Sequence, residues 1–126
     1  MDATLEDARR TGSTRTLFGR RRLFPDLNSR NGQERAAAER AAVNHPIQGT
    51  AADILKRAMI DVDHAIRETP SRMILTVHDE LLFEVPDADA PAVARLVRET
   101  MEQAVSLKVP LTVEVGIGGN WKDAKP

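Results

Sequence analysis

The sequence predicts an α+β fold, in which β-hairpins of an antiparallel sheet pack against long α-helices. Apolar residues recur at helical spacing from Ile47 to Ile66, which predicts a long helix with one buried stripe. Two β-rich runs, residues 73–77 and 81–85, are separated by three polar residues, which predicts a hairpin. Long helices that cover one face of an antiparallel sheet make an α+β arrangement.

The N-terminal part predicts a helix and a second hairpin. Residues 2–10 favour a short helix. Two strands, residues 14–18 and 21–24, flank the Gly19-Arg20 pair, which suits a tight turn.

The middle of the chain predicts a helix on both sides of a proline. Residues 33–43 are rich in alanine, the strongest helix former. Pro46 has no backbone N–H, so we expect it to kink or interrupt the helix before the apolar stripe resumes.

A third helix and a last strand complete the expected elements. Asp87 or Asp89 can cap the helix, with Pro91 in its first turn. Apolar side chains alternate over residues 111–115, which predicts a strand that Gly116 ends.

Composition sets the broad class of the protein. The chain has 126 residues, of which 41% are hydrophobic and 29% charged, so one soluble domain is expected. It has no cysteine, which excludes disulfides and thiolate metal sites. No apolar run is long enough for a membrane span and no signal pattern begins the chain, so we expect a cytoplasmic protein without a membrane partner.

Charge is unevenly distributed along the chain. Residues 1–40 hold nine Lys and Arg against six Asp and Glu, whereas residues 41–126 hold nine against thirteen. A basic first part and an acidic remainder would suit a protein that binds phosphate with one part and metal with the other. Ordinary surface variation explains the charge pattern equally well.

Three polar residues, His78, Asp79 and Glu80, interrupt the second hairpin. Carboxylates are ligands for hard cations such as Mg²⁺, which takes only one or two of them and completes its shell with water and phosphate oxygens. In an extended strand Asp79 and Glu80 point to opposite faces, so one of them is expected to be the principal ligand. The alternative is a solvated hairpin tip.

Arg40, Asn44 and Gln48 are spaced four residues apart, so on a continuous helix they line one face. All three can donate hydrogen bonds to minor-groove acceptors, which every base pair offers, and would therefore sense pairing geometry. The alternative is a solvated helix face. Arg20, Arg21 and Arg22 can contact phosphates, although a simple charged hairpin explains them equally well.

Five motifs occur in fixed order along the chain and are followed by Trp121; they are Thr16-Leu17-Phe18-Gly19-Arg20-Arg21-Arg22, Ala37-Ala38-Glu39-Arg40-Ala41-Ala42-Val43-Asn44, Gln48-Gly49-Thr50-Ala51-Ala52-Asp53, Val77-His78-Asp79-Glu80-Leu81, and Val109-Pro110-Leu111 with Val113-Glu114-Val115-Gly116. In order and spacing these motifs resemble the family A DNA polymerases, the bacterial DNA polymerase I type, over nearly the whole chain. The resemblance implies a palm-type antiparallel sheet, and a single partial domain comprising the C-terminal part of the polymerase palm with an adjoining duplex-contacting helix.

The resemblance also implies roles for the candidate residues. Asp79 matches one of two carboxylates that hold two catalytic Mg²⁺ ions, Glu80 matches a less critical acid beside it, and His78 matches a residue near the primer terminus. Arg40, Asn44 and Gln48 match residues of a helix that contacts the minor groove of primer–template DNA. The complete enzyme would also bind a deoxynucleoside triphosphate.

Several features of the family are missing from this sequence. The family has a second catalytic aspartate in an Asp-Tyr-Ser motif and a fingers helix with Arg, Lys and Tyr; neither occurs here. We therefore expect that the chain begins after both motifs and does not polymerise by itself. The acidic hairpin lacks the strand that it pairs with in the family, so self-association through its open edge is expected.

Gly12-Ser13-Thr14-Arg15 stands where the family usually has Gly-Tyr-Val-Glu, so the resemblance does not specify how the first hairpin packs. A non-catalytic nucleic-acid-binding module is the competing interpretation of the whole chain, and a metal-dependent hydrolase built on residues 78–80 is a weaker third.

Overall fold

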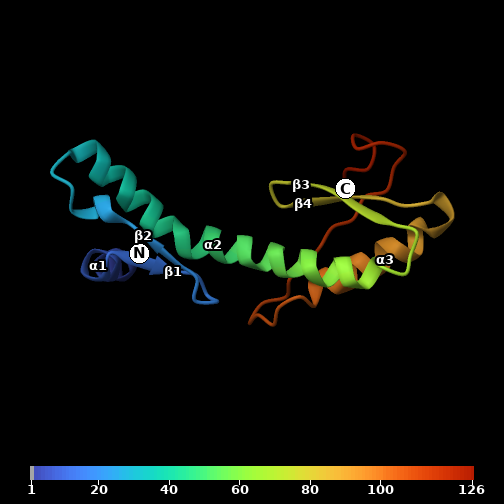
Figure 1. Cartoon of the computed structure of the whole chain (residues 1–126), viewed down its shortest axis with the longest axis horizontal. Coiled ribbons are helices and arrows are strands. Elements are labelled where there is room, and N and C mark those ends of the chain that lie inside the picture. Colours follow the sequence, from blue (N-terminus) through green and yellow to red (C-terminus); the bar gives the residue numbers. More distant parts are fainter. Residues whose placement is uncertain (1) are drawn as a thin grey trace. The chain divides into compact units, whose positions relative to one another are not determined.

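The fold is described for residues 2–126, from a computed structural model. The chain combines helices with two separate antiparallel hairpins, as Figure 1 shows, and divides into two compact units. Unit 1 ends at Asp53, and unit 2 extends over Ile54–Pro126. Each unit is described by itself, and the α+β prediction is confirmed.

Unit 1 begins with a helix and a hairpin. Helix α1 (Asp2–Thr11) is followed by strands β1 (Ser13–Arg15) and β2 (Arg21–Leu23), which pair antiparallel. Gly19 lies in the turn between the strands with a φ of +89°, a left-handed conformation that favours glycine. The predicted hairpin is confirmed, with strands shorter than expected.

A small core holds unit 1 together. A short 3₁₀-helix, η1 (Pro25–Asn28), follows the hairpin and buries Leu27. Leu27 packs with Ala8 of α1, Phe24 and Ala42, which joins α1 and the hairpin to the long helix. Burial of these apolar side chains is what fixes the hairpin against the helix.

Helix α2 (Gly32–Ile66) continues through Pro46 for 35 residues without interruption. We expected Pro46 to kink or interrupt the helix. The helix is not interrupted, so that part of the expectation is wrong. Ala42, His45 and Gly49, on both sides of the proline, are buried against the rest of unit 1. Packing on both sides offsets the one hydrogen bond that the proline removes.

Unit 2 packs a hairpin on two helices. Strands β3 (Arg72–Val77) and β4 (Glu80–Glu84) pair antiparallel, with an irregularity between Met73 and Leu75. A 3₁₀-helix, η2 (Asp87–Asp89), leads into α3 (Ala90–Glu102). The core combines side chains from the C-terminal part of α2, from α3 and from the hairpin; they are Val62, Ile66, Val93 and Val97, with Met73, Phe83, Val85, Leu96 and Met101 packed against them.

The third helix starts where the sequence predicted, but its cap differs. Asp89 occupies the position before the helix and Pro91 lies in its first turn, although the Asp89 side chain makes no capping hydrogen bond. Val93 and Val97 of this helix are buried.

The strand predicted at residues 111–115 is absent from the described part of the chain, so this prediction is wrong. A strand forms only where a neighbouring backbone offers a ladder of hydrogen bonds. Here the Val113 N–H instead donates to the Glu102 carboxylate at 2.9 Å. The alternating pattern reflects partial burial of alternate side chains. Such a pattern does not by itself show that a neighbouring strand is present.

Within residues 2–126, no helix has the length and apolar character that crossing a membrane requires. The prediction of a single partial domain stays a prediction.

Candidate functional site

The acidic turn, which we define as His78, Asp79 and Glu80, forms the tip of the β3–β4 hairpin. Val77 pairs with Glu80, so His78 and Asp79 are the two residues of the connecting turn. His78 has a φ of 54°, a conformation that non-glycine residues adopt uncommonly and that often marks functional sites. The tight turn therefore presents Asp79 at the end of the hairpin, while Glu80 already belongs to β4.

All three side chains of the acidic turn are exposed. No described residue forms a hydrogen bond or ion pair with Asp79, so its carboxylate oxygens face solvent. Among residues 2–126, no three His, Asp or Glu side chains gather into a cluster that could hold a metal. One or two carboxylate ligands fit Mg²⁺, because this ion keeps several waters and takes further oxygens from phosphates. The turn thus fits part of a magnesium site.

The second candidate is a stripe of polar side chains on α2, Arg40, Asn44 and Gln48, which we call the helix face. All three are exposed, and because α2 continues through Pro46 they lie on one side of an unbroken helix. The buried residues Ala42 and Gly49 lie on the opposite side of the same helix. The first hairpin and α1 therefore cover the other side of α2 and leave the helix face open within unit 1.

Hydrogen bonds fix the first hairpin to the buried side of α2. Thr14 Oγ1 and His45 Nδ1 lie 2.7 Å apart, and the Leu17 N–H donates to Thr50 Oγ1 at 2.8 Å. A Cβ atom added to Gly49 would lie 2.7 Å from the Thr16 side chain, so only glycine allows the turn to come this close. The Gly49-Thr50 pair of the sequence motif thus forms a docking point for the hairpin.

The three consecutive arginines have different surroundings. Arg20 Nε donates to Asp53 Oδ1 at 2.7 Å, and its Nη2 donates to the Gly49 carbonyl at 3.2 Å. Arg22 lies 4.9 Å above the Phe24 ring, a cation–π contact. Arg21 is exposed and makes no such contact with a described residue. Arg20 therefore holds the hairpin against α2, while its side chain, like those of Arg21 and Arg22, stays exposed.

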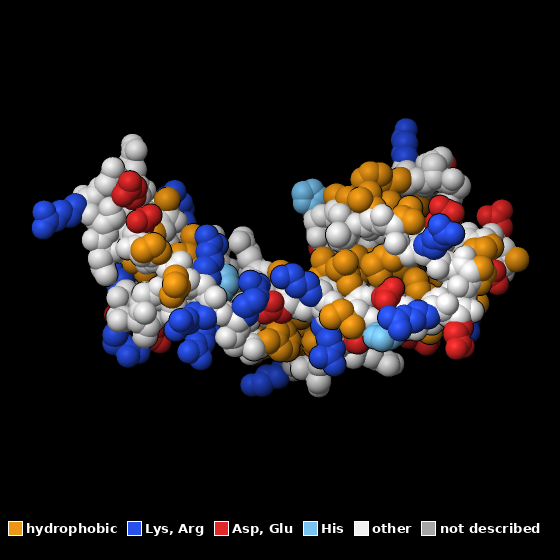
Figure 2. Space-filling model, viewed as in Figure 1, with side chains coloured by type: hydrophobic (Ala, Val, Ile, Leu, Met, Phe, Trp, Pro, Cys, Tyr) orange, Lys and Arg blue, Asp and Glu red, His pale blue; other side chains and the backbone are white. Residues whose placement is uncertain are grey.

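Arginine side chains are prominent on the side of unit 1 that Figure 2 presents. The basic character that the sequence predicts for its first forty residues is thus expressed at the surface.

His45 is a buried residue that the sequence patterns did not single out. It is only 6% exposed, its Nδ1 contacts Thr14, and its Nε2 has no hydrogen-bond partner among the described residues. Burial lowers the pKa of His45 below its usual value, and the charges of Arg20 and Arg22 lower it further, against a smaller opposing effect of Asp53. These effects favour the neutral form of His45 in the folded chain. The only sequence signal for its burial is that it lies four residues before Gly49, on the same side of a helix.

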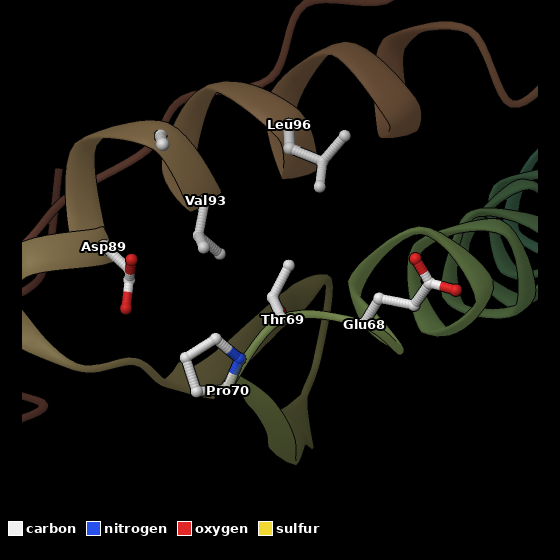
Figure 3. Close-up of a pocket in the computed structure, with 7 residues that line it drawn as sticks. Glu68, Thr69, Pro70, Asp89, Val93 and Leu96 are labelled. Carbon is white, nitrogen blue, oxygen red and sulfur yellow. The ribbon is translucent and has the colours of Figure 1, made fainter.

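Unit 2 also contains a shallow pocket of about 300 Å³. Figure 3 shows Val93 and Leu96 of α3 extending toward Thr69, with the carboxylates of Glu68 and Asp89 at the sides. None of the predicted site residues lines it; Val93 and Leu96 belong to the core of unit 2, whereas Glu68, Pro70 and Ala92 are exposed.

Comparison with known proteins identifies the family. The model of DNA polymerase family A matches residues 1–123. The thermostable DNA polymerase I of Thermus caldophilus is 54% identical over 125 residues, which are 99% of this chain and 15% of that protein. DNA polymerase I of Deinococcus radiodurans is 54% identical over 122 residues, 97% of this chain and 13% of that protein. The chain thus spans about one seventh of the length of these relatives.

A solved structure agrees with this assignment. The POL domain of Pol1 from M. smegmatis, in complex with DNA primer-template and dNTP, matches 98% of this chain and 22% of its own with a TM-score of 0.92 and 53% sequence identity. The acidic turn and the helix face both fall within the matched residues 1–123. The chain belongs to DNA polymerase family A.

Proposed function

We propose that this chain is part of a DNA-directed DNA polymerase that performs template-directed nucleotidyl transfer, in which the primer 3′-hydroxyl attacks the nucleotide α-phosphate. The exposed carboxylate of Asp79, held in a two-residue turn beside the unusual backbone of His78, is the observation that carries the proposal. A hard cation would bind the carboxylate oxygens here without breaking an ion pair between described residues.

Each residue of the acidic turn has a proposed role. Asp79 would hold Mg²⁺ as the principal ligand, and Glu80, one residue into β4, would be a secondary ligand. His78 would lie near the primer terminus. Two Mg²⁺ ions, when bound, would supply charge stabilisation to the attacking and leaving oxygens of an in-line displacement. Asp79 would provide one carboxylate of that site.

The helix face would contact primer–template DNA. Arg40, Asn44 and Gln48 are open donors on one side of α2, and donors of this kind suit the purine N3 and pyrimidine O2 acceptors of the minor groove. The similar POL domain is described in complex with primer-template and dNTP, which supports DNA and a deoxynucleoside triphosphate as partners. Arg20, Arg21 and Arg22 would contact phosphates, and Arg20 would also support the hairpin through Asp53.

The chain would correspond to a partial palm domain with the adjoining helix, in a cytoplasmic enzyme. Because the sequence contains no tyrosine and hence no Asp-Tyr-Ser motif, we propose that these 126 residues do not extend a primer by themselves. The β3–β4 sheet has only two described strands, so an outer edge is open for pairing with a second copy.

A non-catalytic nucleic-acid-binding module is the second candidate. One observation favours it: the helix face is complete and exposed within unit 1. Such a module would bind DNA through the helix face and would not need Asp79.

Paramagnetic Mn²⁺, a substitute for Mg²⁺, tests the metal site in the full chain. In an NMR titration of the isotope-labelled chain, the amide signals of residues 78–80 should broaden first. Asp79→Asn should remove this local broadening, whereas Asp87→Asn, which changes another exposed acid of unit 2, should leave it. Broadening that began elsewhere and persisted in Asp79→Asn would contradict the proposed metal site and favour the binding module.

A further inference from the structure

The first hairpin places two arginines directly opposite each other. In the register of β1 and β2, Arg15 pairs with Arg21 and Thr14 pairs with Arg22. Like charges on directly opposite residues destabilise a pair of strands. This arrangement therefore costs the free chain stability unless something else neutralises the two guanidinium groups.

The hydrogen-bond pattern of the hairpin shows how close the Cα atoms of Arg15 and Arg21 lie. The Thr16 N–H donates to the Arg20 carbonyl and the Phe24 N–H donates to the Gly12 carbonyl, so those two pairs are hydrogen-bonded pairs. Pairs alternate along an antiparallel ladder, which makes Arg15 and Arg21 a non-hydrogen-bonded pair. In such pairs the Cα atoms are about 4.5 Å apart and the side chains are at their closest.

The two arginines share the face of the hairpin that points away from α2. Thr14, on the other face, is buried and contacts His45 of α2. Side chains alternate between faces, so Arg15 and Arg21 emerge together on the opposite side. Both are exposed.

Acidic residues of unit 1 do not neutralise this pair. No hydrogen bond or ion pair joins Arg15 or Arg21 to any side chain that the structure describes. Three acids of unit 1 have other cationic partners: Asp7 pairs with Arg10, Glu39 with Arg9, and Asp53 with Arg20.

We propose that Arg15 and Arg21 together form a binding site for one backbone phosphate of nucleic acid. Arginine is suited to phosphate because its planar guanidinium offers paired donors to the phosphate oxygens. A phosphate between the two groups would convert their repulsion into two attractions. The inference deepens the proposed function, on which it rests for the identity of the nucleic acid, and adds Arg15 to the contacts of the arginine hairpin.

A phosphate of a polymer fits this site better than a free phosphate or pyrophosphate. The two side chains stand exposed on a two-stranded ribbon, and none of the described pockets includes them. A small anion in such an open place would gain little over water, whereas a duplex adds contacts elsewhere and releases counterions.

The test measures binding of the full chain to a labelled primer–template duplex as a function of salt. Arg15→Ala and Arg21→Ala should each weaken binding about three- to tenfold. The double variant should be scarcely weaker than either, and its log K against log salt slope should be shallower by about 0.9, the loss of one phosphate contact. Arg98→Ala, an exposed arginine of α3, is the matched control for the loss of one positive charge.

Three further measurements complete the test. Arg15→Ala should not lower the melting temperature of the free chain, because it relieves repulsion. Inorganic pyrophosphate should displace the duplex no better than an equal ionic strength of chloride salt; displacement that Arg15→Ala abolishes would overturn the assignment to a backbone phosphate. Arg40→Ala reports separately on the helix face.

The outcomes distinguish this inference from the proposed function. If Arg15→Ala binds as well as Arg98→Ala while Arg40→Ala binds less well, the phosphate site is wrong and the proposed DNA contact stands. If Arg15→Ala binds less well and Arg40→Ala matches the control, the phosphate site is supported and the helix face fails. Losses in the two hairpin variants that simply add would overturn the single shared phosphate.

Discussion

Thr14 Oγ1 lies 2.7 Å from Nδ1 of His45, and this buried polar pair joins the first hairpin to α2. The Phe24 ring meets the imidazole edge to face, with centroids 6.1 Å apart and planes at 65°. The helix face belongs to the same stretch of α2, so the pair supports the segment of α2 that would contact DNA.

Thr14→Val should destabilise the chain by about 1–3 kcal/mol, the cost of leaving a buried polar group without its partner. Valine matches threonine in shape, so the loss would report the hydrogen bond and not packing. Thr14→Ser keeps the hydroxyl and should cost clearly less. Denaturant unfolding of the three chains measures this, and equal stability of Thr14→Val and the parent would show that the bond contributes nothing.

The stability of unit 1 should fall as the pH falls below about 6.5, the ordinary histidine pKa. The pKa of His45 is lowered in the folded chain by burial and by Arg20 and Arg22, with Asp53 opposing, so the unfolded chain binds the proton first. The contribution of His45 to the free energy of unfolding is then fully present above pH 6.5. It is lost as the pH falls through the lower pKa of the folded chain. Unfolding curves across this range check the direction.

His45→Gln should flatten this part of the pH profile, because glutamine does not titrate. His64→Gln, which changes an exposed histidine of α2, is the control and should leave the decrease in place. A decrease that is unchanged in His45→Gln would assign it to other groups.

Gly49→Ala should destabilise the chain by about 1–3 kcal/mol, the usual cost of overpacking, although alanine favours helices over glycine. The added Cβ would lie 2.7 Å from the Thr16 Cγ2 and 2.9 Å from the His45 Nε2. Gly32→Ala is the matched control, since its Cβ would meet nothing nearer than an Arg35 side-chain atom at 3.9 Å. Thermal unfolding compares the two; a stabilising Gly49→Ala would refute the close approach.

The sequence predicts the elements whose signals are local. Helix periodicity, the Gly19 turn and the break at residues 78–80 each identify an element without knowledge of its neighbours. A polar interruption of the hairpin predicts the acidic turn, and a four-residue spacing predicts the helix face; the structure presents both at the surface.

Other features depend on partners that the sequence does not specify. Residues 111–115 have strand periodicity but no strand beside them in the described chain. Pro46 does not interrupt α2, because buried residues on both sides hold the helix. Arg20 is an arginine like the two residues that follow it, yet only the fold brings it to Asp53. Likewise, only the fold brings His45 to Thr14.

Arg40→Ala should weaken duplex binding by about 1–3 kcal/mol, the range for losing a hydrogen bond with a charged donor. Minor-groove acceptors are common to all correct pairs, so the loss should be nearly the same for every template sequence. Discrimination against a mismatch near the primer end should also decline. Fluorescence titrations with several duplexes test this, with Arg98→Ala as the control; losses confined to particular sequences would contradict a geometry-sensing role.

Primer extension by Asp79 variants tests the central claim most directly. In a complete family A polymerase that carries this segment, Asp79→Ala and Asp79→Asn should each slow extension by about a hundredfold or more, the scale of losing one electrostatic contact to the transition state. Folding and duplex affinity should stay nearly unchanged, because the side chain is exposed and packs against no core residue. Asp87→Asn should extend normally. Extension at the parent rate in both Asp79 variants would contradict the catalytic role of this carboxylate.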